Sequence, residues 1–129
     1  MMIDLTVVEA LAEEMNAKIA AIRGWKREVL FGCWPEWMKP DGERRAVYAW
    51  HPWTSDADTL EALDEVITIY PNLSVAFYYA QLTKTWSVDI TQWKMTPQLH
   101  TIQWSVAGCD KIRSKAICMA IIALAEKMS

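Results

Sequence analysis

Residues 50–58, WHPWTSDAD, concentrate groups that bind ligands or move protons, with two tryptophans, a histidine and two aspartates in nine positions. A histidine beside carboxylates can act as an acid–base pair or hold a metal ion. Pro52 cannot donate to a sheet ladder, so a strand is expected to end here and Ser55 or Asp56 to cap a helix. Because Asp56 and Asp58 then lie near the positive end of that helix, capping explains both acids and we expect no metal site.

Tryptophan is far more frequent than usual, with eight in 129 residues. Trp25, Trp86 and Trp104 occupy positions where a core role is expected. Trp34, Trp37, Trp50 and Trp53 flank one hairpin, where exposed aromatic rings would form a binding surface and buried ones structural lids or a self-association patch. The candidate aromatic surface, with the neighbouring histidine, consists of Trp34, Trp37, Trp50, His51 and Trp53.

The cysteines do not form a recognisable site. Cys33, Cys109 and Cys118 are widely separated and include no C-x-x-C pair, and both histidines are solitary. We therefore expect reduced core cysteines of a cytosolic protein, with no metal and no cofactor. Cys109 is the nearest thing to a nucleophile, but His100 lies a whole predicted strand away, so no catalytic residue is expected and the protein is predicted not to be an enzyme.

Composition limits the partners. The formal net charge is −3 and the sequence pI about 5.3, which disfavours nucleic acid, since phosphate-binding chains usually concentrate basic residues. The longest uncharged apolar stretch, residues 116–125, falls well short of the roughly 20 residues that cross a bilayer. No basic region precedes an apolar core at the N-terminus, so no secretory signal and no membrane partner are expected, and the predicted location is cytoplasmic.

Hydrophobic spacing predicts alternating helices and hairpins. Gly24 is expected to end the first helix, residues 34–42 to form a long hairpin connection, and Pro71 to end the second helix. The alanine-rich stripe of the last helix predicts close packing against a sheet. We predict helices over 4–22, 56–70 and 110–128, with strands over 29–31, 44–50, 74–82, 85–91 and 100–106.

Residues 1–129 are thus predicted to be a single α+β domain of order α-β-β-α-β-β-β-α. We expect a mostly antiparallel sheet of about five strands packed with three helices as an α/β/α sandwich. In the second helix, the buried stripe is expected to be Leu60, Leu63, Ile67 and Tyr70. Alternation should place Trp86, Val88 and Ile90 inside, and Ile102, Trp104 and Val106 together on one face.

Four features in order resemble the phage ABA-sandwich domain family over essentially the whole chain. They are G-W-K at residues 24–26, a hairpin rich in proline and tryptophan, P-W-T-S-D-A at 52–57 and A-I-C-M-A at 116–120. The resemblance implies a bacteriophage or prophage protein with a sheet between helical layers, and it implies no site residues. The segment between Trp86 and Leu99 is longer than the family pattern, which leaves its strand register open.

Two functional hypotheses follow. The first is a non-enzymatic interaction module that binds a phage or host protein, with a homo-oligomer as a further option. The second is nucleic-acid binding, because the order α-β-β-β-α over residues 56–128 matches that of the double-stranded-RNA-binding domain. Its candidate contacts are Lys111, Arg113 and Lys115. These alternate positions point about 200° apart around a helix, which disfavours one basic patch.

Overall fold

The computed structural model describes residues 5–29 and 34–128 of the chain. It confirms an α+β fold, and none of the helices in the described part is long and apolar enough to cross a membrane. The elements are α1 (Leu5–Ile22), β1 (Lys26–Glu28), β2 (Glu36–Met38), β3 (Arg44–Ala46), the 3₁₀ turn η1 (Val47–Ala49), α2 (Asp56–Ile69), β4 (Leu73–Ala80), β5 (Thr85–Met95), β6 (His100–Asp110) and α3 (Arg113–Met128).

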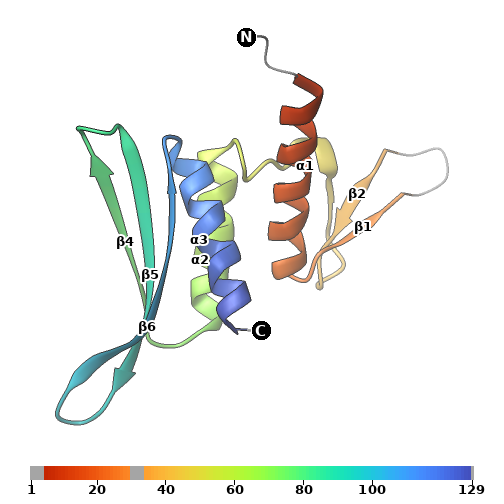
Figure 1. The fold of residues 1–129 in the computed structure, drawn as a ribbon. Coiled ribbons are helices and arrows are strands. Elements are labelled where there is room, and N and C mark those ends of the chain that lie inside the picture. The colour runs from red at the N-terminus through yellow and green to blue at the C-terminus, as the bar shows by residue number, and fades with distance from the viewer. Residues whose placement is uncertain (1–4, 30–33, 129) are drawn as a thin grey trace.

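The described strands form two three-stranded antiparallel sheets, ordered β1-β2-β3 and β4-β5-β6, and not one sheet of about five strands. Figure 1 shows the helices lying between the two sheets, so the expected α/β/α layering is wrong. The broad apolar stripe of α3 explains the difference. One side of α3 packs on β5 and β6, and the other contacts α1 and α2. Its apolar stripe is therefore buried against helices as well as against a sheet.

The first sheet departs most from prediction. Its first strand lies at Lys26–Glu28, before the expected 29–31, of which residues 30 and 31 are outside the described part. The expected connection 34–42 contains β2, and the return strand stops at Ala46, where η1 begins. In β2, Trp37 is only 5% exposed and pairs with both neighbouring strands, so burial of one large side chain outweighs the local turn signals.

The second sheet follows the expected alternation over most of its length, with Val88 and Ile90 fully buried. A register shift between Gln92 and Trp93 interrupts it: Gln92 pairs with Trp104, while Trp93 pairs with Ile102. This bulge turns Ile102 to the face opposite Trp104, where it is 60% exposed. The prediction that Ile102 shares the inner face is therefore wrong.

The predicted end of the first helix and the predicted start of the second helix are both confirmed. Gly24 takes a left-handed φ of +76° directly after α1, and the Ser55 hydroxyl accepts from the Asp58 amide at 3.2 Å to cap α2. The buried face of α2 is rotated from the expected stripe, with Leu60 at 40% exposure. Its buried residues are Thr59, Ala62, Leu63 and Val66, and the small ones let α3 approach closely.

Gly108 in β6 allows α3 to lie flat on the second sheet. A Cβ placed on Gly108 would lie 2.1 Å from the Ala116 carbonyl oxygen and 2.5 Å from the Ala120 amide nitrogen. Since both contacts are helix backbone, neither can move without shifting α3. The expected close packing of the alanine-rich helix is confirmed here.

Gly108→Ala should therefore lower the free energy of unfolding by about 3 kcal/mol, since overpacking against backbone cannot be relieved by a rotamer change. Urea denaturation measures the loss. Ala107→Val is the matched control, because Ala107 is the exposed neighbour on the other face of β6, and it should change stability by about 0.5 kcal/mol or less. Equal effects of the two variants would contradict the close approach.

Candidate functional site

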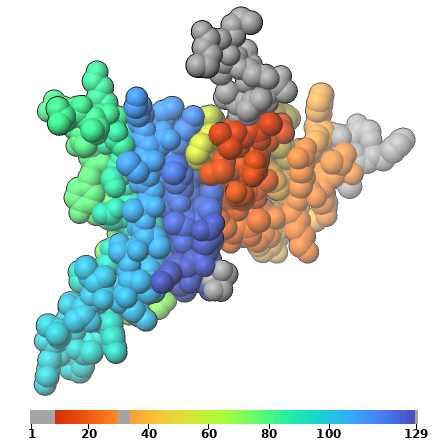
Figure 2. Space-filling model, viewed as in Figure 1, coloured from red at the N-terminus to blue at the C-terminus, as the bar shows by residue number. Residues whose placement is uncertain are grey.

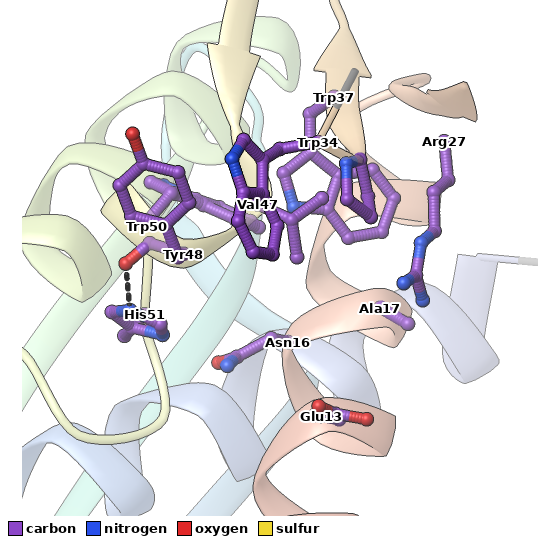
Figure 3. Close-up of a pocket in the computed structure, with 11 residues that line it drawn as sticks. Glu13, Asn16, Ala17, Arg27, Trp34, Trp37, Val47, Tyr48, Trp50 and His51 are labelled. Atoms are coloured by element: carbon purple, nitrogen blue, oxygen red, sulfur yellow. Dashed lines mark hydrogen bonds between the residues drawn. The ribbon is translucent and has the colours of Figure 1, made fainter. Parts of the chain in front are cut away.

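A pocket of about 320 Å³ lies between α1 and the first sheet. Figure 3 shows Glu13, Asn16 and Ala17 of α1 facing the aromatic side chains of the hairpin, with Arg27 of β1 reaching in from the side. Four residues of the candidate aromatic surface belong to its lining: Trp34, Trp37, Trp50 and His51. Four of the five candidate residues chosen from the sequence thus line one cavity. The sequence did not single out Glu13, Asn16, Ala17, Arg27 or Tyr48, which line it as well.

Of the two alternatives left open for this set, an exposed surface or buried structural lids, burial holds for three of its five members. Trp34 is 78% exposed and His51 is exposed, whereas Trp37, Trp50 and Trp53 are at most 7% exposed. The rings pack on one another, with centroids 4.5 Å apart for Trp25–Trp50 and 6.2 Å for Trp37–Trp50. Three-residue strands supply few aliphatic side chains, so large indoles fill this half of the core.

Two donors in the pocket wall have no acceptor. The indole nitrogens of Trp37 and Trp50 are buried and meet no hydrogen-bond partner in the described part of the chain. A buried donor left unpaired costs about 1–3 kcal/mol, and these two nitrogens are shielded from the space inside the pocket as well. The wall of the pocket is therefore mainly aromatic and apolar.

The rim of the pocket carries opposite charges. Glu13 on α1 and Arg27 on β1 are both exposed, and neither forms an ion pair with a described residue. Asn16 is already engaged, since its Oδ1 accepts from the Trp53 amide at 2.9 Å. His51 Nε2 donates to the Tyr48 carbonyl oxygen, which fixes the imidazole at the rim (Figure 3). Two charges therefore remain available to a bound molecule.

The acids of residues 50–58 face separate partners and do not converge on His51. Asp56 pairs with Arg113 at 3.1 Å, and Asp58 accepts from the His51 backbone amide at 2.8 Å, not from its ring. Within the described residues, no group of three or more His, Cys, Asp or Glu side chains could hold a metal ion. The arrangement is that of a capped helix start.

The remaining candidates are also dispersed. His100 begins β6 and the exposed Cys109 lies near its other end, so they are not within reach of each other. Burial raises the pKa of the Cys118 thiol to about 11, even though the Thr59 hydroxyl lies 3.4 Å away and opposes the shift. Of the basic residues, Lys111 is exposed, Arg113 pairs with Asp56, and Lys115 lies 5.4 Å over the Trp53 ring, so they form no compact patch.

A buried arginine, which sequence reasoning missed, fixes the wall of the pocket. The Arg23 side chain is 3% exposed at the end of α1, donates to Glu61 Oε1 at 3.3 Å and pairs with Glu65. Its guanidinium lies 4.1 Å from the Trp25 ring centroid and 5.7 Å from that of Trp50. The helical spacing of Asn16, Ile19 and Arg23 on one buried face was the available signal.

Glu61 responds to this arginine and to a second one. Burial alone would raise the pKa of its carboxyl group, but the charge of Arg45, 3.2 Å away, and the bond from Arg23 outweigh it and lower the pKa below the ordinary 4.5. A lowered pKa means that the carboxylate stabilises the fold above pH 4.5 and that this stabilisation is lost as pH falls.

Comparison of the chain with family models, with curated proteins and with solved structures gave no match.

Replacing both carboxylates, Glu61→Gln with Glu65→Gln, should lower the free energy of unfolding by about 3–5 kcal/mol at about pH 7, because it leaves Arg23 buried without a counter-charge. Glu14→Gln is the control, since Glu14 forms an exposed pair with Lys18, and it should cost about 0.5 kcal/mol or less. The gap between wild type and the double variant should narrow below pH 4.5. An equal gap at about pH 3 and about pH 7 would contradict the role of these charges.

Cys118 should resist thiol reagents until the protein unfolds, because its pKa is raised to about 11 and its side chain is buried. A Cys33→Ser, Cys109→Ser variant isolates this thiol for labelling with a chromogenic disulfide. A Cys33→Ser, Cys118→Ser variant reports the exposed Cys109 and should react on mixing. Rapid native-state labelling of Cys118 would show that α3 is not packed as described.

Proposed function

We propose that this protein is a non-enzymatic interaction module that binds a protein partner by taking a short segment of the partner chain into the pocket between α1 and the first sheet. The observation that carries the proposal is the pocket itself. It combines aromatic walls with opposite charges at the rim.

Peptide chemistry matches these features one by one. A volume of about 320 Å³ is at the small end of ligand pockets, which suits one apolar side chain and its adjoining backbone. The rings of Trp34, Trp37 and Trp50 give such a side chain aromatic faces to pack against. Glu13 and Arg27 would contact charges that flank the inserted side chain and so select among segments.

The structure favours a protein partner over nucleic acid. The order of α2, β4, β5, β6 and α3 does match that of the double-stranded-RNA-binding domain. However, Arg113 is paired with Asp56 and Lys115 lies over Trp53, so two of the three candidate phosphate contacts are already engaged. The sequence resemblance to the phage ABA-sandwich family supports a bacteriophage or prophage origin and a role in the bacterial cytoplasm.

A peptide-display library panned against the purified chain tests the proposal. Ala17→Trp should fill the pocket without removing a core contact, because Ala17 is exposed on α1 and belongs to the lining. Peptides enriched on the wild type should bind this variant at least about tenfold more weakly. Ala21→Trp is the control, since Ala21 is an exposed alanine one helical turn further along α1 and outside the lining, and it should keep the affinity.

Several outcomes would contradict the proposal. Enriched peptides that bind both variants equally, or the absence of enrichment, would overturn a pocket-based interaction. Duplex RNA serves as a second probe in filter binding. Salt-sensitive RNA affinity that is lost in Lys111→Glu with Lys115→Glu would support the nucleic-acid hypothesis instead.

A further inference from the structure

Strand β4 forms an open edge of the second sheet. It pairs with β5 along residues 73–80, and its other side faces away from the rest of the molecule (Figure 1). Figure 2 shows this edge, in green, at the flank opposite α1 and the first sheet. Its outward N–H and C=O groups are a template for another strand.

This edge lacks the devices that usually prevent pairing. Residues 73–82, LSVAFYYAQL, contain no charged residue, no proline and no glycine. The register with β5 is continuous from Leu73 to Ala80, without a bulge. Phe77, Tyr78 and Tyr79 are between 44% and 57% exposed, so large apolar side chains stand on both faces of the edge.

The helices leave part of the inner face of β4 uncovered: Leu73 and Val75 pack partly buried against the core, whereas Phe77 and Tyr79 do not. On that face α3 packs against β5 and β6, and Val88 and Ile90 are fully buried. Phe77 and Tyr79 point to the same side, because they pair with Val88 and Trp86, yet they remain about half exposed. Apolar side chains of another strand, placed beside them on the same face, would continue the core that α3 covers in part.

We propose that β4 pairs antiparallel with β4 of a second copy of this chain, giving one continuous sheet of six strands about a two-fold axis. An axis perpendicular to the sheet keeps each face on its own side, so residues of the same face become partners. With the axis at Phe77, that ring lies opposite the partner subunit's Phe77, Val75 opposite the partner's Tyr79, and Ala76 opposite the partner's Tyr78.

Charge and symmetry identify a second copy as the occupant. Copies of this chain repel through a net charge of −3, but an uncharged strand meeting itself places no like charges across the pair. The register also places a small side chain opposite a large one at Ala76 and Tyr78. Pairing of β4 with itself uses up this edge in both copies and closes the assembly, whereas pairing of β4 with β6 would leave edges free and propagate. This surface is separate from the pocket, so the dimer stands or falls independently of the proposed function.

Analytical ultracentrifugation of the full chain at micromolar concentration tests the dimer. Wild type should sediment as a dimer, and Phe77→Lys should shift it to monomer by at least a tenfold weaker association, because two lysines would face each other across the axis. Ile102→Lys is the matched control, since Ile102 is 60% exposed on β6 and outside the proposed interface, and it should remain dimeric. Circular dichroism checks that both variants are folded.

Cross-linking provides a second measurement that does not depend on a destabilising charge. Phe77→Cys in a Cys33→Ser, Cys109→Ser background should form a disulfide-linked dimer on mild oxidation, since Cβ atoms of opposed residues in a strand pair lie about 4.5–5.5 Å apart. Lys84→Cys in the same background places the cysteine at the turn beyond β4 and should not form a disulfide-linked dimer. A monomeric wild type, a Phe77→Lys dimer, or an open-ended polymer would each overturn the proposal.

Discussion

A buried cation, Arg23, organises this molecule. Arg23 lies at the end of α1, and burying its guanidinium is tolerable only because Glu61 and Glu65 of α2 approach it and two indole faces lie against it. Both carboxylates stay almost half exposed, so they keep part of their hydration and the desolvation cost falls mainly on the arginine. One residue thus orients α1 against α2 and positions the tryptophans that form the pocket wall.

The tryptophans form the core of the N-terminal half and line its pocket at once. A sheet of three-residue strands cannot exclude water with its own aliphatic side chains, and buried indoles do so instead. Filling a core with indoles leaves polar N–H groups inside, as at Trp37 and Trp50. The same choice of residue that stabilises this half of the protein therefore leaves two unpaired N–H groups in its core and places aromatic side chains along the cavity beside it.

Features that depend on residues close in sequence could be predicted, and features that depend on contacts between distant residues could not. The helices, the Gly24 stop, the Ser55 cap and the alternation of β5 are set by residues close in sequence, and these predictions are confirmed. Strand β2 was missed because its stability comes from the burial of Trp37 between two other strands. The layer order was wrong because an apolar helix stripe does not reveal whether a sheet or another helix will cover it. For the site, the aromatic residues were identified, but the α1 and β1 residues that complete the pocket join it only through tertiary contacts.

The order of the elements along the chain makes one half of the molecule easier to unfold than the other. Helix α2, the three strands of the second sheet and helix α3 follow one another along the chain. Each strand of that sheet pairs with its sequence neighbour, so this half has mostly local contacts and can fold as a unit. The N-terminal half depends on short strands, on the contact of α1 with α3 and on Arg23. Amide exchange through partial unfolding should therefore be faster in that half, and a molecule held in its pocket would slow exchange there while leaving the second sheet unchanged.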